Sequence, residues 1–418
     1  MEWKKYRLGD LACSIQTGPF GSQLHQSDYS SNGTPVIMPK DMMDGKISES
    51  SIARVADDHV ERLKRHKVKS GDVVYSRRGD VGRCVLITDK EDGWLCGTGC
   101  LKVELDDQKV LPSFLFYILQ RKDSVGWVEN HAVGSTMPNL NTGILSKLPV
   151  MLPTLKEQQC IASILSAYDK LIENNNKRIR ILEKMAENLY TEWFVRFRFP
   201  GHENVPMENG LPKGWRYIIV GERYNVTIGK TPPRKEFEWF VSNDVNAQNW
   251  LTISDMKGMF VWDTAEQITR TALERFNMVI VPAKTILLSF KLTVGRVTIA
   301  SVPLCTNEAI AHFVNVPTIE HEYLYQQLRL FDYRKLGNTS AIGNAINSKI
   351  VKSMKLVLPT TDKLETFHKM VAPIFNKILS LTKQSSNLAR QRDLLLPRLM
   401  SGKLSISVDY SCLLCPRI

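Results

Sequence analysis

The sequence predicts an α+β protein built from two tandem copies of one module, each followed by a long amphipathic helix. Two stretches of the chain match one another in the same order. Each match ends in an apolar run, a proline and a long helical pattern, as expected for a repeated unit. The two helical patterns share one apolar spacing, which predicts that the helices form an antiparallel coiled coil.

The internal repeat is clearest where an apolar run ends in a proline. Residues 145–153 and 351–359 match in this way, and their closing prolines lie 206 positions apart. Upstream, residues 68–83 face residues 281–296 at an offset of 213. Both of these stretches carry a turn, an apolar strand, a serine, a basic residue and then Val-Gly-Arg. The common order of the matches favours duplication over chance.

The repeat divides the chain into six segments. A stretch rich in proline and glycine separates the halves and cannot continue a helix. The expected segments are a first module at 1–153, a central helix at 154–199, a linker at 200–214, a second module at 215–360, a second helix at 361–404 and a tail at 405–418.

Each module has a mixed pattern in which strands predominate. Apolar runs at 73–76, 84–87 and 101–105 are broken by glycine turns and predict strands. Residues 113–120 and their counterpart 322–329 have a helical pattern. We therefore expect a twisted, mainly antiparallel sheet with short helices.

The two long helices are predicted from their starts and their apolar spacing. Thr154 and Glu157 fit a capping box at the first start, and residues 362–365 are a plausible cap for the second helix. Pro373 is expected to kink or interrupt the first turns of the second helix. Steps that average about 3.5 residues define a coiled-coil seam. The seam residues are Ile161, Leu165, Tyr168, Ile172, Ile179, Leu182 and Leu189 in the first helix, and Phe367, Val371, Ile374, Ile378, Leu381, Leu388, Leu395 and Leu399 in the second.

The alternative is that each helix packs on its own module and the two are unrelated. An isolated amphipathic helix of this length would leave its seam exposed. Antiparallel pairing of the two helices covers both seams.

Composition narrows the class of protein. The formal charge of +12 and the pI of about 9.2 favour a polyanionic partner, most often nucleic acid. No run approaches the roughly 20 apolar residues of a membrane span, so we expect a cytoplasmic protein that contacts no membrane. Cys96 with Cys100, and Cys412 with Cys415, lack the second ligand pair of a structural zinc site, and we expect reduced thiols and no metal.

Several motifs carry a family resemblance over nearly the full length of the chain. They lie at residues 18–22, 229–233, 75–83, 155–159, 192–197 and 392–404. Each is weak alone, but their order and the duplication make the set specific. In these features the chain resembles the specificity subunit of type I restriction–modification systems.

The resemblance implies two target-recognition domains, each reading one half of a bipartite site in the major groove of double-stranded DNA. The helices would set the gap between the half-sites and dock two modification subunits, which use S-adenosylmethionine. The complex can add two motor–nuclease subunits. Residues 289–293 differ from residues 76–80 at the matching position, so contact residues cannot be copied between the modules.

Basic residues near predicted turns are the candidates for DNA contact, because cations bind phosphates and arginine suits bidentate contact with guanine. For any single residue, a solvated surface cation is an equally good interpretation. The candidates are Lys40, Arg77, Arg78 and Arg83 in the first module and Lys230, Arg234, Lys235, Lys291 and Arg296 in the second.

Two other classes of protein fit the sequence less well. A DNA methyltransferase would carry an Asn/Asp-Pro-Pro-aromatic loop, whereas the only Pro-Pro here lies in residues 231–234. Residues 229–231 are similar to the end of a P-loop, but Tyr224 stands where that motif needs its first glycine. We therefore expect no catalytic residues and no cofactor in this chain. A purely structural coiled-coil adaptor would not explain the basic charge.

Overall fold

The computed structural model describes residues 3–21, 23–134, 137–242, 244–336 and 346–400. The chain forms two compact units. The first contains the residues up to Leu171 and those from Asn387 onward, and the second contains Ile172–Ser386. Each unit therefore holds one module together with a part of each long helix. The tail with Cys412 and Cys415 lies outside the described residues.

The first module is built on two four-stranded sheets. One has the order β2-β11-β8-β9 and is antiparallel throughout, and the other has the order β10-β4-β7-β3 with a parallel β4–β10 pair. A separate β1–β12 pair joins the start of the module to its end. The strands are β1 (Lys4–Arg7), β2 (Ala12–Thr17), β3 (Tyr29–Ser30), β4 (Thr34–Ile37), β5 (Met42–Met43), β6 (Lys46–Ile47), β7 (Ala53–Val55), β8 (Val73–Ser76), β9 (Cys84–Leu86), β10 (Leu95–Cys96), β11 (Cys100–Leu105) and β12 (Pro149–Leu152). The helices are α1 (Asp57–Arg62), α2 (Pro112–Leu119), α3 (Lys122–His131) and α4 (Thr142–Leu145).

The second module repeats this topology, which confirms the duplication. Its sheets have the orders β16-β24-β21-β22 and β23-β18-β20-β17, again with one parallel pair in the second sheet, β18–β23. A fifth strand, β19, is added beside β22, and β15 pairs with β25. The strands are β15 (Arg216–Ile219), β16 (Asn225–Ile228), β17 (Phe240–Val241), β18 (Gln248–Leu251), β19 (Phe260–Val261), β20 (Glu266–Ile268), β21 (Ile286–Ser289), β22 (Val297–Ala300), β23 (Cys305–Thr306), β24 (Ile310–Val314) and β25 (Lys355–Leu358). The helices are α6 (Val220–Arg223), α7 (Arg270–Arg275), α8 (His321–Leu330) and α9 (Ser348–Lys352).

Matched local interactions underlie the matched topology. Asn141 caps α4 by accepting a 2.8 Å hydrogen bond from the Ile144 amide, and Asn347 caps α9 through the Ile350 amide at 3.0 Å. An asparagine at this position satisfies an amide that the first helical turn leaves without a partner. The predicted strands and the short helices α2 and α8 are also present, with bounds that differ from the prediction by one residue or none.

The central strand of each antiparallel sheet carries a buried basic residue at the same position of the ladder. Lys102 on β11 pairs with Val74, and His312 on β24 pairs with Leu287, 213 positions after Val74. Lys102 donates a 3.0 Å hydrogen bond to the Lys67 carbonyl. Both side chains are buried, so each needs a polar partner within the module.

His312 obtains its partners from two threonines. Its Nδ1 lies 3.0 Å from the Thr227 hydroxyl and its Nε2 lies 2.6 Å from the Thr306 hydroxyl. Burial lowers the pKa of His312 to about 4, because removal from water disfavours the charged imidazolium. The ring is therefore neutral at pH 7.

The segment between the modules is structured. It contains a short hairpin of β13 (Met207–Glu208) and β14 (Leu211–Pro212). Its turn is Asn209-Gly210, with φ values of 53° and 79°, and Asn-Gly favours such a tight hairpin turn because both residues tolerate positive φ. The preceding helical segment ends at Val195, before the first proline and glycine of the linker, and the linker is not irregular throughout.

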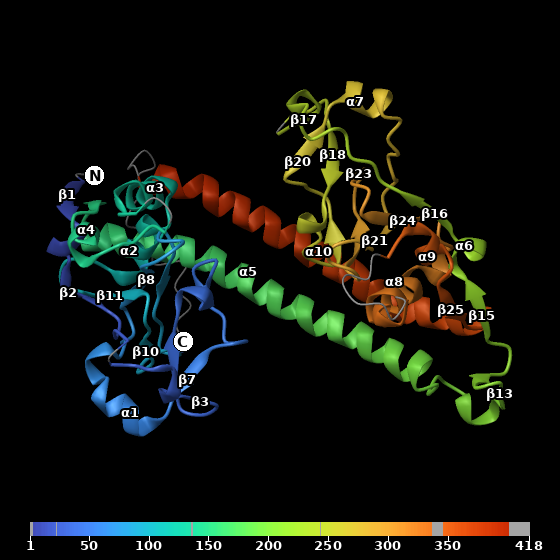
Figure 1. The fold of residues 1–418 in the computed structure, drawn as a ribbon, viewed down its shortest axis with the longest axis horizontal. Helices are drawn as coiled ribbons and strands as arrows, with labels where there is room; N and C mark the ends of the chain where they lie inside the picture. Colours follow the sequence, from blue (N-terminus) through green and yellow to red (C-terminus); the bar gives the residue numbers. More distant parts are fainter. Residues whose placement is uncertain (1–2, 22, 135–136, 243, 337–345, 401–418) are drawn as a thin grey trace. The chain divides into compact units, whose positions relative to one another are not determined.

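Helix α5 (Leu155–Tyr190) begins at the predicted capping box. The Thr154 amide donates to the Glu157 carboxylate at 3.0 Å, and the Glu157 amide donates to the Thr154 hydroxyl at 3.4 Å. The α-helix gives way to a π-helical turn at Thr191–Val195, so the helical segment ends before residue 199. Figure 1 shows α5 as one continuous helix.

Helix α10 (Thr361–Met400) begins at the predicted residue but without the predicted cap. It begins at Thr361, and the Thr360 carbonyl accepts from the amides of Lys363 and Leu364. Residues 362–365 are therefore inside the helix, and the predicted cap there is wrong. Pro373 does not interrupt the helix, which is continuous through it. Pro373 and Lys369 are both exposed, so water can satisfy the carbonyl that loses its amide donor.

Contacts within each unit show that the two long helices run antiparallel. In the first unit, Arg392 donates to the Asp169 carboxylate at 2.5 Å. In the second, the Asn175 amide group donates to Gln384 at 3.3 Å, and the rings of Trp193 and Phe367 lie 5.8 Å apart. As the residue number increases along the first helix, the number of the contacting residue on α10 decreases. All fifteen predicted seam residues are buried or half-buried.

The ends of the seam are covered by the modules as well as by the other helix. Ile161, Leu165 and Leu399 belong to the core of the first module. Phe367, Val371 and Ile378 belong to the core of the second. The described helices include none that is long and apolar enough to cross a membrane.

We expect the Asp169–Arg392 pair to stabilise the helix pairing in the first unit. Asp169 also accepts a 2.5 Å hydrogen bond from the Tyr117 hydroxyl, so it ties both helices to α2. A double-mutant cycle with D169N and R392Q should give a coupling free energy of about 0.5–1 kcal/mol in urea unfolding. The exposed Glu61–Lys64 pair on the surface of the first module is the matched control. Equal coupling in both pairs would contradict this role.

Because His312 is buried with a lowered pKa, we expect the protein to lose stability in mild acid. Its folded-state pKa lies below the unfolded value, so the unfolded state binds the extra proton and the free energy of unfolding falls as the pH drops from about 6.5 toward 4. The contribution is about 3 kcal/mol over this range. Urea unfolding of H312Q should show a flatter dependence on pH, whereas H131Q, on the exposed His131 of α3, should follow the wild type. Identical profiles for H312Q and the wild type would disprove the assignment.

Candidate nucleic-acid interface

The turn between β8 and β9 and the turn between β21 and β22 occupy matching places in the two modules. Each turn begins at a fully buried serine. The Ser76 hydroxyl donates to the Arg78 carbonyl at 3.1 Å, and the Ser289 hydroxyl donates to the Thr293 carbonyl at 2.5 Å. The amides of Ser76 and Ser289 donate to the carbonyls of Arg83 and Arg296, both at 2.9 Å. These bonds fix the base of each turn from inside the module.

The tip of each turn projects from this fixed base. Gly79 in the first module and Leu292 in the second lie 213 positions apart and both have positive φ, 75° and 58°. Arg78 and Lys291 precede them, and both are exposed. The two tips therefore share a residue with positive φ and an exposed cation before it, but they differ in the side chain at the positive-φ position.

In the first module, a second loop lies against the tip. The Gly79 amide donates to the Pro138 carbonyl at 3.2 Å. Arg77 donates to the Asn139 side chain at 3.3 Å, and its guanidinium lies 5.3 Å from the centre of the Phe20 ring. Phe20 and Asn139 are not among the residues predicted from the sequence, because their separation from Arg77 along the chain carries no signal of contact.

Arg83 and Arg296 each bond to a backbone carbonyl in the segment that follows the first strand of the parallel pair, β4 or β18. Arg83 pairs with Asp80 at 2.5 Å and donates to the Met42 carbonyl at 3.4 Å. Arg296 donates to the Ile253 carbonyl at 3.0 Å. The Met42 carbonyl lies in β5, a few residues after β4, and the Ile253 carbonyl lies in the turn after β18. The shared Val-Gly-Arg motif thus has a role inside the protein in both modules.

Lys230 and Arg234 are also engaged within the protein. Lys230 donates to the carbonyls of Phe276 and Asn277 at 3.1 and 2.9 Å, at the end of α7. Arg234 makes a bidentate pair with Glu266, with both distances 2.9 Å. Its guanidinium also lies over the rings of Phe240 and Trp250, 4.4 and 4.6 Å from their centres.

The remaining candidates have charged groups that face solvent. Lys40 makes only a long 3.4 Å bond to the Ser51 carbonyl, and Lys291 lies 5.9 Å from the Phe290 ring. Arg78 and Lys235 are exposed, and within the described part of the chain their side chains make no hydrogen bond or ion pair. Of the nine candidates, Lys40, Arg78, Lys235 and Lys291 are the most available to a polyanion.

A basic surface in the first module was missed. Lys64, Arg65, Lys67 and Lys69 line a pocket of about 510 Å³ together with the acidic residues Asp92 and Glu104. The basic run at residues 62–69 is visible in the sequence and could have been found from it. Lys69 pairs with Glu104 at 3.6 Å, so part of this charge is neutralised within the module.

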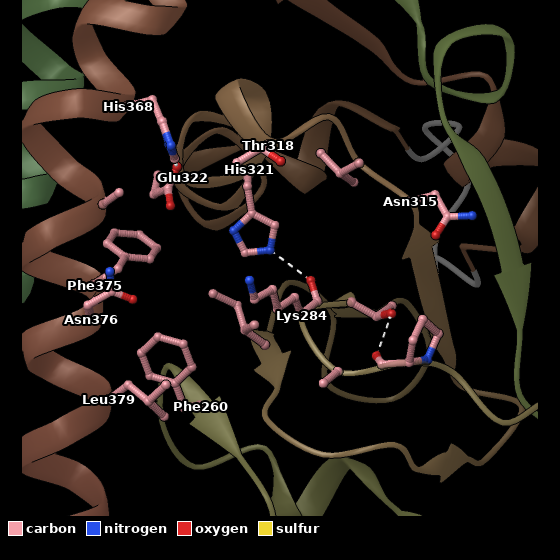
Figure 2. A pocket seen from close by; sticks show the side chains of 16 residues that line it. Phe260, Lys284, Asn315, Thr318, His321, Glu322, His368, Phe375, Asn376 and Leu379 are labelled. Atoms are coloured by element: carbon pink, nitrogen blue, oxygen red, sulfur yellow. Dashed lines mark hydrogen bonds and ion pairs between the residues drawn. The ribbon is translucent and has the colours of Figure 1, made fainter.

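Figure 2 shows a pocket of about 400 Å³ in the second unit. His368 lies 2.6 Å from the Glu322 carboxylate, and His321 lies 2.7 Å from the Lys284 carbonyl. Phe375 and other apolar side chains complete the wall. Both imidazoles are therefore held by partners within the protein.

Cys96 and Cys100 do not form a thiolate site. Burial raises the pKa of Cys96 to about 12, and the Cys100 thiol donates to the Ile37 carbonyl at 3.3 Å. Both thiols are thus protonated at pH 7. Among the described residues, no group of three or more histidine, cysteine, aspartate or glutamate side chains could hold a metal ion.

Comparison with known proteins identifies the family. The model of the type I restriction modification DNA specificity domain matches residues 1–184 and again residues 212–389. The chain belongs to this family. The double match agrees with the two modules of the fold.

Relatives and a solved structure agree with this assignment. The chain is 24% identical to the type I restriction enzyme HindI specificity subunit of Haemophilus influenzae, with 96% of this chain and 100% of that protein covered. It is 25% identical to the MjaIX specificity subunit of Methanocaldococcus jannaschii, with 91% and 88% covered. The fold is similar to the crystal structure of the type I S subunit from M. genitalium, with a TM-score of 0.59, 17% identity and 97% of each chain covered.

Substitutions of Arg78 and Arg83 are expected to separate effects on DNA affinity from effects on the stability of the fold. R78Q should weaken binding to duplex DNA and reduce the slope of log affinity against log salt by about 1, because one phosphate contact is lost. Its melting temperature should not change. R83Q should lower the free energy of unfolding by about 1 kcal/mol, because it removes bonds within the module. Salt-dependent binding and thermal unfolding measure both effects, and the opposite pattern would disprove the division.

Proposed function

We propose that this chain is the non-catalytic, cytoplasmic subunit that recognises DNA in a type I restriction–modification complex. Each module would address one half of a split site in double-stranded DNA. The observation that carries this proposal is the pair of matched turns, one in each module, with the same buried base and different tips. Two such turns suit two half-sites of different sequence, because base contacts specify and phosphate contacts position.

The long helices would set the gap between the half-sites. The 36 residues of α5 correspond to about 54 Å of helix. Polar pairs such as Asn175–Gln384 support a single register, because a polar contact in a coiled-coil seam disfavours shifted alignments.

The helices would also dock two modification subunits, which would bind S-adenosylmethionine, and two motor–nuclease subunits can join the complex. Exposed apolar side chains on α5 support docking. Ile181 and Met185 lie one turn apart on this helix and are 61% and 48% exposed. Such a pair on a helix surface suits packing against a partner.

The glycine loop at residues 229–231 is explained by packing and needs no bound phosphate. A Cβ at Gly229 would collide with Thr306, and one at Gly18 would collide with the Gly97 carbonyl. Both glycines allow a strand end to cross close to a neighbouring backbone. This shared role supports a binding module over a nucleotide-using enzyme.

The proposal is tested by binding the chain, together with its modification partner, to a randomised duplex pool. We expect enrichment of one split motif. Exchange of residues 1–153 for the module of a relative should then change one half-site only. Enrichment of an unsplit motif, or of none, would overturn the proposal.

The gap is tested by lengthening both helices together. Insertion of seven residues into the middle of α5 and into the facing part of α10 preserves the seam, because one heptad, or about two helical turns, is added to each helix. The gap should increase by about three base pairs, since seven residues add about 10 Å. Both half-sites should stay the same. Insertion into α5 alone is the control and should disrupt the pairing, and a changed half-site after the double insertion would contradict the assigned role.

A further inference from the structure

Leu292 occupies a position that folding alone does not explain. Its side chain is 97% exposed at the tip of the turn between β21 and β22, so it contributes almost nothing to the core. Its φ of 58° lies in the left-handed region, which a branched residue rarely adopts. The matching residue of the first module is Gly79, for which this backbone is unstrained.

The base of the turn holds Leu292 in a defined place. Gly295 lies against the ring of Tyr333, where a Cβ would be 3.0 Å from the ring. The Tyr333 hydroxyl donates to the Leu328 carbonyl at 2.6 Å, and the Ser289 hydroxyl closes the turn from below. The tip is therefore presented from a packed base.

We propose that Leu292 determines specificity by contacting the 5-methyl group of a thymine in the major groove. This inference rests on the proposed function and applies to the half-site read by the second module. The thymine methyl is the apolar group on the major-groove edge of an unmodified base pair, and apolar side chains recognise it. Lys291, the exposed cation next to it, supplies a phosphate contact that positions the tip.

The exposure of Leu292 favours a methyl contact over insertion between base pairs. A wedge must resist the force of restacking, and a side chain that is 97% exposed has almost no neighbours to support it. A methyl contact needs only apolar surface at the right place. In the first module, Gly79 offers no side chain, and Arg78 is the exposed group at that tip, so the two modules are expected to recognise different bases.

The test compares the wild type and L292G in the full chain with its modification partner, using the randomised duplex pool. Glycine suits the positive φ, so the melting temperature of L292G should be no lower than that of the wild type. L292G should lose the preference for thymine at one position of one half-site and leave the other half-site and the gap unchanged. V245G is the matched control, because Val245 is also 97% exposed but lies between β17 and β18, and its motif should be unchanged.

A second measurement replaces that thymine by deoxyuridine, which lacks the methyl group. The affinity of the wild type should fall about fourfold, the cost of one buried carbon, and the affinity of L292G should not change. If the wild type enriches no split motif, the proposed function itself fails. If it does, an unchanged L292G motif, the same change in V245G, or a wild type insensitive to deoxyuridine would overturn the role of Leu292.

Discussion

The antiparallel packing of α5 against α10 is the constraint on which both modules depend. Each compact unit contains a part of each helix, so neither module completes its core from its own residues alone. Leu399, near the end of α10, is buried in the core of the first module. Trp193 and Phe194, at the end of the central helix, are buried in the core of the second. A shift of one helix along the other would remove apolar side chains from both cores and cost several kcal/mol, so the packing of the modules also stabilises the register of the helices.

The duplication separates positions that the fold constrains from positions that it leaves free. Matched residues with one structural role include Ser76 with Ser289, Gly18 with Gly229, Asn141 with Asn347 and Arg83 with Arg296. Lys102 and His312 show an intermediate case, because each module buries a basic residue there but satisfies it with different partners. The tips differ completely in size, with Gly79 in one module and Leu292 in the other.

The sequence predicted the parts of the fold that depend on local pattern. The duplication, the strands of the antiparallel sheets and the Thr154–Glu157 capping box are all confirmed, because apolar periodicity and capping are properties of neighbouring residues. Helix α10 begins at the predicted residue, but Thr360, and not residues 362–365, accepts from the amides of its first turn, and the segment predicted as a linker contains the Asn209-Gly210 hairpin. The candidate site was less predictable. A basic residue in the sequence does not reveal whether its hydrogen-bond donors are already engaged within the fold. Those of Arg234 bond to Glu266, which lies 32 residues away in the chain.

The matched turns show how one scaffold can present different surfaces without loss of stability. The serine at the base of each turn is fully buried and bonded to the backbone, so a change there would leave buried polar groups without partners. The residue at the tip contacts almost nothing, and the strain of a leucine with positive φ is only about 1 kcal/mol. This cost is small compared with the free energy that the buried apolar side chains of each core contribute to folding. A module with a fixed base and a tolerant tip can therefore vary the surface it presents while its fold, and the helices packed against it, stay the same.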